Sequence, residues 1–223
     1  MAEHSHTDIV SHSTNAFPAR TGEEFLAFLT ALATSDLSKP SDPAHPKPIE
    51  KFLGSHPAAL AFVQAPKPAP SSFARESYFA LTAYHFTNKD GDTRFGRYRI
   101  VPVAGNEHLD AKAAAAMGSN YLFDELHERL VQGPIEFRVL VQLAEAGDVV
   151  DDATIHWPAD RTLLELGRLV LTHPVEENAA EQKWIIFDPI PRVDGIEPSA
   201  DPLLDVRAAV YLISGRRRRD AGK

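Results

Sequence analysis

Two clusters of proline restrict how this chain can fold more than any other feature of its sequence. Residues 37–48 hold Pro40, Pro43, Pro46 and Pro48, and residues 64–72 hold a second cluster, Pro66, Pro68 and Pro70. Proline lacks a backbone N–H and fixes φ, so neither cluster suits the interior of a helix or of a central strand. We therefore expect two Pro-rich irregular connections within the chain, at residues 37–48 and 64–72.

The spacing of apolar residues predicts the elements around these connections. Phe25, Phe28, Leu29 and Leu32 recur at helical spacing after Thr21-Gly22-Glu23-Glu24, which favours an N-terminal helix. The remaining pattern predicts further helices over residues 49–63, with Pro57 starting the second of two, and over residues 108–130. It predicts a β-hairpin from residues 78–86 and 93–103, joined by a turn at 88–92, and strands over 135–144 and 166–172.

A final helix is expected near the C-terminus. Asp201 suits the cap and Pro202 the first turn, and apolar residues follow at helical positions. Gly215 is expected to end this helix, before the cationic run Arg216-Arg217-Arg218-Arg219.

Arg207 and Tyr211 lie four residues apart on this predicted helix and so share one of its faces. A free tyrosine ionises near ~10, so an anionic tyrosine at neutral pH needs a fixed cation or a metal beside it. Tyrosinate is one of the proximal ligands used for haem iron. The alternative interpretation is structural: Tyr211 is a core aromatic residue on an amphipathic helix and Arg207 extends to solvent.

Composition narrows the class of protein. The 223 residues carry 23 basic and 31 acidic side chains, and this acidic balance argues against a nucleic-acid partner despite the terminal arginines. The absence of cysteine excludes disulfides, thiolate ligands and a cysteine nucleophile. No stretch has the apolar length of a signal sequence or a membrane span. We expect a soluble, cytoplasmic protein without a membrane partner.

An ordered series of motifs resembles the proximal haem side of catalases. The series consists of Gly167-Arg168-Leu169-Val170-Leu171, residues 181–189 (Glu-Gln-Lys-Trp-Ile-Ile-Phe-Asp-Pro), Gly195-Ile196-Glu197-Pro198-Ser199 and the Arg207/Tyr211 pair. The whole chain is similar to the catalase-related peroxidase branch of that superfamily. The resemblance implies an α+β fold with an antiparallel β-barrel of catalase type, here partial with about four strands, flanking helices and a C-terminal proximal haem helix. It also implies a single domain over residues 1–223.

The resemblance further implies a role for each matching residue. Tyr211 is the axial ligand of the haem iron, Arg207 keeps it ionised and takes part in catalysis, and Arg218 binds a haem propionate. Near the N-terminus, Asp8-Ile9-Val10 and Phe17-Pro18-Ala19-Arg20 resemble the catalase stretch that carries a distal asparagine. By this alignment His12 is a catalytic residue near the distal asparagine position, and Phe17 and Phe25 line the haem.

The sequence also departs from the family pattern. Catalases carry their distal histidine in a segment that precedes the region where this sequence begins, so we expect an N-terminally short domain, weak turnover and an open sheet edge. The chain is then a fragment, the product of a wrongly started reading frame, or a subunit that pairs. Two functions stay open. One is a haem-dependent peroxidase, a single subunit or a homo-oligomer, acting on hydrogen peroxide or organic peroxides with an unidentified electron donor. The other is a haem-binding or structural remnant with little or no turnover.

Overall fold

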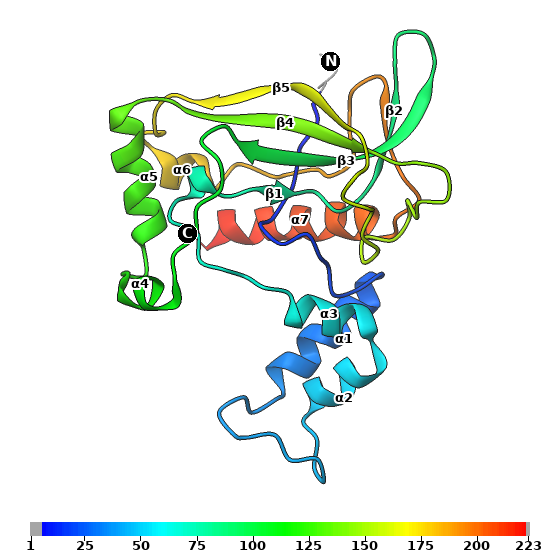
Figure 1. Ribbon diagram of the computed structural model, residues 1–223, viewed down its shortest axis with the longest axis vertical. Coiled ribbons are helices and arrows are strands. Elements are labelled where there is room, and N and C mark those ends of the chain that lie inside the picture. Colours follow the sequence, from blue (N-terminus) through cyan, green and yellow to red (C-terminus); the bar gives the residue numbers. More distant parts are fainter. Residues whose placement is uncertain (1–5, 222–223) are drawn as a thin grey trace.

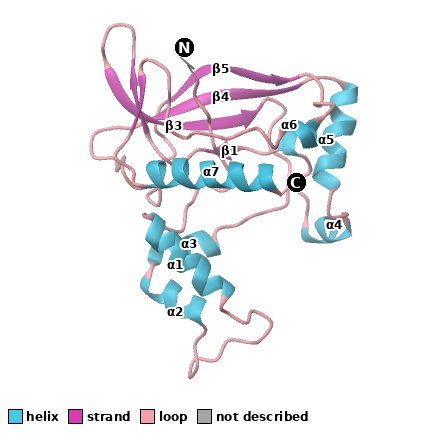
Figure 2. Ribbon diagram, turned by 180° about the vertical axis from the view of Figure 1, so that it is seen from behind, coloured by secondary structure: helices cyan, strands magenta, loops and turns pink. Residues whose placement is uncertain are grey.

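A computed structural model describes residues 6–221, and the structural statements below refer to these residues (Figure 1). A twisted antiparallel sheet lies above the long C-terminal helix, and three N-terminal helices project from the opposite side of that helix (Figures 1 and 2). The helical elements are α1 (Gly22–Ala33), α2 (Pro48–Ser55), α3 (Pro57–Gln64), the 3-10 turn η1 (Phe73–Arg75), α4 (Ala111–Ala116), α5 (Tyr121–Gln132), α6 (Asn178–Glu181) and α7 (Leu203–Asp220). The strands are β1 (Tyr78–Phe79), β2 (Tyr84–Thr87), β3 (Thr93–Pro102), β4 (Ile135–Leu143), β5 (Leu163–Leu171) and β6 (Ile196–Pro198).

The six strands form one open sheet. Their order is β5-β4-β3-β2-β6, with β1 paired to β3, and every pairing is antiparallel. Long alternating segments build its centre, where Tyr98 of β3 lies opposite Val141 of β4. The prediction of an α+β fold with a partial antiparallel barrel, flanking helices and a C-terminal helix is confirmed.

The predicted strand over residues 78–86 is in fact two strands. Phe79 pairs with Arg99 and Tyr84 pairs with Gly96, so four residues on one side, 80–83, lie opposite two on the other. The extra residues belong to the segment 80–83, whose side chains are all buried. Residues 80–83 thus form an irregular connection between β1 and β2, although their apolar content predicts one continuous strand.

Two helix boundaries also differ from those predicted. The region 108–130 contains the separate helices α4 and α5, with a turn at Gly118 between them. Gly215 does not end α7, because it is buried where the helix contacts Ile186; a Cβ added at Gly215 would lie 2.5 Å from Ile186 Cγ1. The Arg216–Arg219 run is therefore part of α7. At its other end α7 begins at Leu203 with Pro202 in the cap position, one residue later than predicted, and Asp201 Oδ1 accepts the Leu203 N–H at 2.9 Å.

The apolar core is divided. One cluster joins β2, β3 and β4 to α7 through Tyr84, Tyr98, Val141 and Leu204. Another holds α1, α2 and α3 together around the buried residues Phe28, Ile49 and Ala59. Residues 37–47 and 65–72 contain no helix or strand, with Pro48 starting α2 and Gln64 ending α3. Between residues 6 and 221 no helix combines the length and apolarity needed to span a membrane.

Candidate functional site

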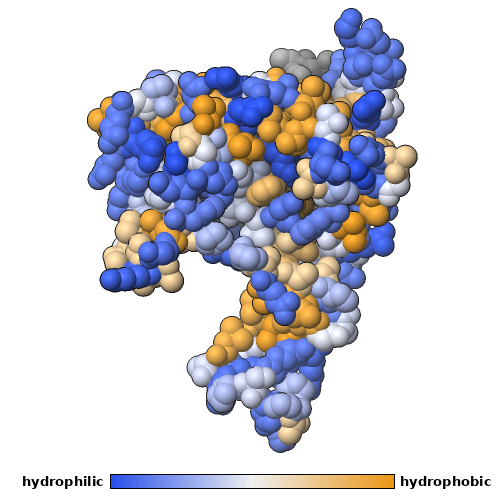
Figure 3. All heavy atoms as spheres, viewed as in Figure 1, coloured by the Kyte–Doolittle hydropathy of each residue, from blue (hydrophilic) through white to orange (hydrophobic). Residues whose placement is uncertain are grey.

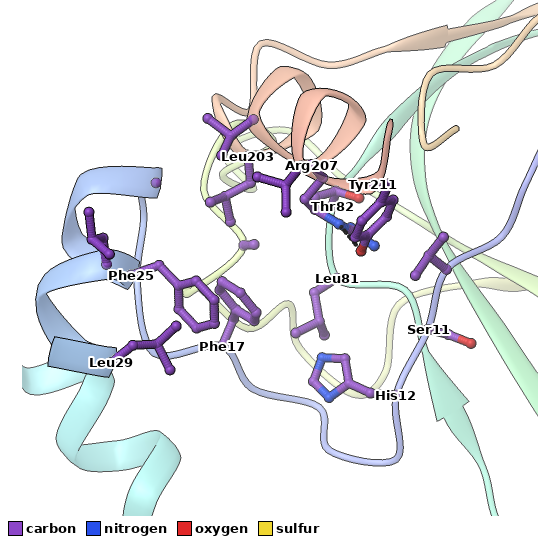
Figure 4. A pocket seen from close by; sticks show the side chains of 16 residues that line it. Ser11, His12, Phe17, Phe25, Leu29, Leu81, Thr82, Leu203, Arg207 and Tyr211 are labelled. Atoms are coloured by element: carbon purple, nitrogen blue, oxygen red, sulfur yellow. Dashed lines mark hydrogen bonds between the residues drawn. The ribbon is translucent and has the colours of Figure 1, made fainter. Parts of the chain in front are cut away.

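A cavity of about 690 Å³ lies between α1, α7 and the extended N-terminal segment (Figure 4). Its walls are mainly aliphatic and aromatic. Five predicted site residues, which come from separate parts of the sequence, all line it: His12, Phe17, Phe25, Arg207 and Tyr211. An apolar cavity with a few convergent polar groups is the usual form of a cofactor or substrate site.

Arg207 and Tyr211 form the polar part of the wall contributed by α7. Arg207 Nε donates a hydrogen bond to the Tyr211 hydroxyl oxygen at 2.9 Å, and the guanidinium carbon lies 5.4 Å from the centre of the phenol ring. Residues four apart on a helix are neighbours, so local geometry alone brings the two groups together. The arrangement directs a cation at the one atom of Tyr211 that can become an anion.

Behind Arg207 lies a buried carboxyl group that the sequence analysis treated only as a helix cap. Asp201 is 3% exposed, and burial raises its pKa above the ordinary value for aspartate, while the positive charges of Arg97 and Arg207 oppose that rise. Asp201 is therefore coupled electrostatically to Arg207, the cation of the site.

Arg97 is the second buried charge near the site that sequence reasoning missed. It is 1% exposed, donates to the backbone oxygens of Asp152 at 3.0 Å and Ile155 at 2.7 Å, and stacks 4.3 Å from the Trp157 ring centre. Burial lowers its pKa to about 10. The sequence does show that Arg97 and Arg99 alternate with other residues along β3 and so share one face of the strand. It does not show that this face is buried.

His12 lies across the cavity from Tyr211 (Figure 4). Its backbone is fixed by two hydrogen bonds to Phe79, with N···O distances of 3.2 and 2.8 Å. Burial, and secondarily the positive charge of Arg207, lowers the pKa of His12 below its usual value. The imidazole is therefore neutral at pH 7 and able to accept a proton.

Aromatic rings form the wall nearest α1. Phe17 stacks on Phe25 with ring centres 5.2 Å apart, and the His12 and Phe17 rings meet edge to face with their centres 6.3 Å apart. Phe25 continues this contact to Phe28 in the core of the three-helix unit. The cavity therefore borders both parts of the molecule.

Arg218 does not line this cavity. It lies farther along α7 beside a shallow hollow formed with Val210, Ile213 and Ser214. Its guanidinium donates to Ser214 Oγ at 3.1 Å and to the backbone oxygen of Ile185. Val210 contributes to both spaces, so the hollow adjoins the cavity along the same helix.

The side chains at the cavity are too few to coordinate a free metal ion, but they suit a metal held in a cofactor that supplies most of the ligands. Within residues 6–221 no three His, Asp or Glu side chains converge on a common point. Tyr211 offers one oxygen in a mainly apolar cavity, and the porphyrin of a haem would supply four nitrogens to its iron, so that one protein oxygen would be enough to hold it. The residues present thus fit a haem better than a free metal ion.

Comparison with known proteins agrees with this chemistry. The family model for catalase matches residues 1–222, and the chain belongs to the catalase family. It is 32% identical to a catalase-related peroxidase of Synechococcus elongatus over 206 residues, which cover 92% of this chain and 60% of that protein. It is also 32% identical to a catalase-related peroxidase of Mycolicibacterium paratuberculosis, covering 98% of this chain and 68% of that protein.

Solved structures show the same fold. Catalase A from Saccharomyces cerevisiae superposes with a TM-score of 0.78 at 22% identity, covering 97% of this chain and 47% of that one. A fungal catalase gives the same TM-score, with 97% and 46% covered. The chain thus spans about half the length of these structures, and the similarity confirms the catalase-type fold predicted from the sequence motifs.

Proposed function

We propose that the protein is a haem-dependent peroxidase of the catalase type, acting on hydrogen peroxide or an organic peroxide with a separate electron donor. The observation that carries the proposal is the Arg207–Tyr211 hydrogen bond inside an apolar cavity, with the neutral His12 imidazole across from it. Its support from outside the molecule is membership of the catalase family.

In this proposal Tyr211 holds the iron through its phenolate oxygen, and Arg207 stabilises the negative charge on that oxygen through its donated hydrogen bond. Phe17 and Phe25 provide flat apolar contacts for the macrocycle. Haem bound there would supply an iron that accepts electrons from the donor and passes them to peroxide. A propionate contact from Arg218 stays a prediction, supported by its position farther along α7.

His12 is proposed to move the proton. Reduction of ROOH to ROH and water takes up two electrons from the donor and two protons, and it requires a proton to leave one peroxide oxygen and reach the other. A neutral imidazole accepts that proton and returns it, a step commonly worth about 10²- to 10⁴-fold in rate. The lowered pKa keeps the His12 ring in the accepting form at neutral pH.

A second candidate function is haem binding with little peroxide turnover, and it rests on how few titratable side chains line the cavity. Among the sixteen residues that line the cavity, His12 is the one titratable side chain besides Arg207 and Tyr211. If its imidazole alone activates peroxide poorly, the protein binds haem with little turnover. Peroxidase activity of the haem-loaded protein no higher than that of free haem would favour this haem-binding function.

The ligand assignment is tested by loading haem into the protein and into Tyr211→Phe. We expect the absorption and electron paramagnetic resonance spectra of tyrosinate-ligated ferric iron from the natural sequence, and their loss in Tyr211→Phe. Tyr121→Phe is the matched control, because the Tyr121 hydroxyl donates to the Pro70 backbone oxygen away from the cavity. An unchanged spectrum in Tyr211→Phe would show that another group ligates the iron.

A further inference from the structure

The irregular connection at residues 80–83 brings a threonine to the wall of the cavity. Its four residues lie opposite two of β3, so the chain bulges out of the sheet between β1 and β2. The Ala83 carbonyl oxygen accepts the Ser199 N–H at 3.3 Å, which holds the bulge beside the segment that leads into α7. Bulges often redirect a side chain towards a functional site, and the polar side chain that this bulge places at the cavity is Thr82.

The hydroxyl group of Thr82 is buried without a hydrogen-bond partner. Thr82 is 2% exposed, and no group in the described part of the chain makes a hydrogen bond with its Oγ1 atom. Thr154 shows the usual arrangement, because its Oγ1 donates to Asp152 Oδ1 at 2.7 Å. Burying a hydroxyl without a partner is destabilising, and a valine of similar shape would avoid that cost. Unpartnered buried groups therefore call for an explanation, and a functional role is one of the common ones.

Few polar side chains at the cavity can serve as the partner of Thr82. The others that line it are Ser11, His12, Arg207 and Tyr211. The two from the N-terminal segment lie across the cavity, whereas the two on α7 lie on the same side as Thr82 (Figure 4). The remaining lining side chains are apolar, and hydrophobic side chains also reach the surface of the three-helix unit that borders the cavity (Figure 3). The partner of Thr82 is therefore to be sought on α7.

Arg207 has hydrogen-bond donors to spare. Its Nε atom donates to the Tyr211 hydroxyl oxygen at 2.9 Å, while its two Nη groups make no hydrogen bond to any residue between 6 and 221. Tyr84 lies close to both Arg207 and Thr82: burial raises the pKa of Tyr84, and the Thr82 hydroxyl and the positive charge of Arg207 oppose that rise. The Tyr84 hydroxyl donates to the Pro189 backbone oxygen at 3.0 Å, so it has no proton left to donate to Thr82.

We propose that Thr82 is a positioning residue of the site, and that its hydroxyl oxygen accepts a hydrogen bond from an Nη group of Arg207 when haem is bound. This inference rests on the proposed function, because it gives Thr82 a part in holding the tyrosinate ligand. A guanidinium held at Nε by Tyr211 and at Nη by Thr82 has its plane fixed. Its charge then stays directed at the phenolate oxygen, and the bulge at residues 80–83 supplies the acceptor that keeps it there.

The test compares haem affinity with the stability of the haem-free protein in Thr82→Val and Thr82→Ser. Haem Kd is measured by absorbance titration, and the free energy of unfolding of the haem-free chain by urea denaturation. We expect Thr82→Val to raise the haem Kd at least about tenfold, the effect of losing a hydrogen bond to a charged group. Thr82→Ser keeps the hydroxyl and is expected to restore most of the affinity. The haem-free Thr82→Val chain should be at least as stable as the natural one, because it loses an unpartnered buried hydroxyl.

Thr154→Val is the matched control. It removes a hydroxyl that has a partner and does not line the cavity, so it should destabilise the haem-free protein and leave the haem Kd unchanged. A double-mutant cycle with Arg207→Leu tests the route of the effect. Because Thr82 is proposed to act through Arg207, Thr82→Val should raise the haem Kd no further in the Arg207→Leu background. Circular dichroism checks that each variant is folded.

The possible results separate this inference from the proposed function. An unchanged haem Kd in Thr82→Val would overturn the inference and leave the proposed function standing, whereas no haem uptake by the natural chain would overturn both. A haem-free Thr82→Val chain less stable than the natural one would show that the hydroxyl already has a partner, which would also overturn the inference. An equal rise in Kd with and without Arg207 would overturn it by placing the partner of Thr82 elsewhere.

Discussion

At the scale of single residues, the candidate site combines one contact that sequence spacing predicts with others that depend on the fold. The Arg207–Tyr211 hydrogen bond spans one helical turn, so the spacing in the sequence was sufficient to predict it. Placing His12 beside the same cavity needed the family resemblance, because almost two hundred residues separate it from Tyr211. Nothing in the local sequence shows that Arg97 and Asp201 are buried, because their burial depends on how β3, α7 and the loop at residues 152–155 pack.

His12 makes the stability of the folded protein depend on pH. Its lowered pKa in the folded state means that the unfolded chain binds this proton more readily. The corresponding stability is complete above the unfolded value of about 6.5 and is lost as pH falls through that value towards the folded pKa. The His12→Gln variant has no imidazole at this position, so its free energy of unfolding does not include this decrease at low pH. In urea denaturation, we therefore expect the variant to gain free energy of unfolding relative to the natural protein on going from about pH 7.5 to pH 5.5.

The matched control for His12→Gln is His127→Gln, which removes an exposed histidine on α5 and reports the effect of losing a surface histidine. A relative stability of His12→Gln that did not change with pH would contradict the proposed neutral, half-buried imidazole. It would also remove the support for His12 as a proton acceptor in the peroxidase proposal.

At the scale of elements, long periodic segments were predictable and their interruptions were not. Strands β3 and β4 and helices α1 and α7 lie where apolar periodicity placed them. The features that were missed depend on tertiary packing. They are the buried segment 80–83 between β1 and β2, the short strand β6 beside β2, and the continuation of α7 past Gly215. Glycine usually marks a helix end, but here it gives room for a neighbouring segment.

Gly215 is expected to be a steric requirement of α7. Alanine there improves helix propensity, yet its Cβ would lie 2.5 Å from Ile186 Cγ1, so the segment carrying Ile186 must shift. We expect Gly215→Ala to lower the free energy of unfolding by about 1–3 kcal/mol, and Ile186→Ala in the same chain to recover part of it.

Gly54→Ala in α2 is the matched control, because no atom lies within 4 Å of the added Cβ. This change is expected to stabilise the protein by up to about 1 kcal/mol. The comparison is made by denaturant unfolding of all four chains. Equal stabilisation of the Gly215 and Gly54 variants would show that α7 and the Ile186 segment are not packed as described.

At the scale of the whole molecule, the cavity lies where two separately packed parts meet. Helices α1–α3 surround their own core, while α7 packs on the sheet through Leu204. The parts are linked by Gly22 against Val206, by the Phe17–Phe25 stack and by ion pairs of the exposed Arg20 side chain with the exposed Asp151 and the buried Asp152. The Arg20–Asp151 pair is exposed and contributes little stability, so the aromatic and aliphatic contacts at the cavity wall, together with Asp152, couple the two parts. A ligand that fills the cavity would strengthen this coupling by binding only the assembled form.

Removal of Phe28 should separate the two parts in the ligand-free protein. Phe28 is 6% exposed and packs against Phe52 and Phe62, so Phe28→Ala is expected to cost the three-helix core about 3–5 kcal/mol. Native-state hydrogen exchange should then show loss of protection in residues 22–64 with protection retained in β3 and β4. Leu26→Ala, 66% exposed on the same helix, should leave both regions protected. Equal loss across the helices and the sheet would instead show that the chain unfolds as the single domain predicted from its sequence, with the cavity as part of one continuous core.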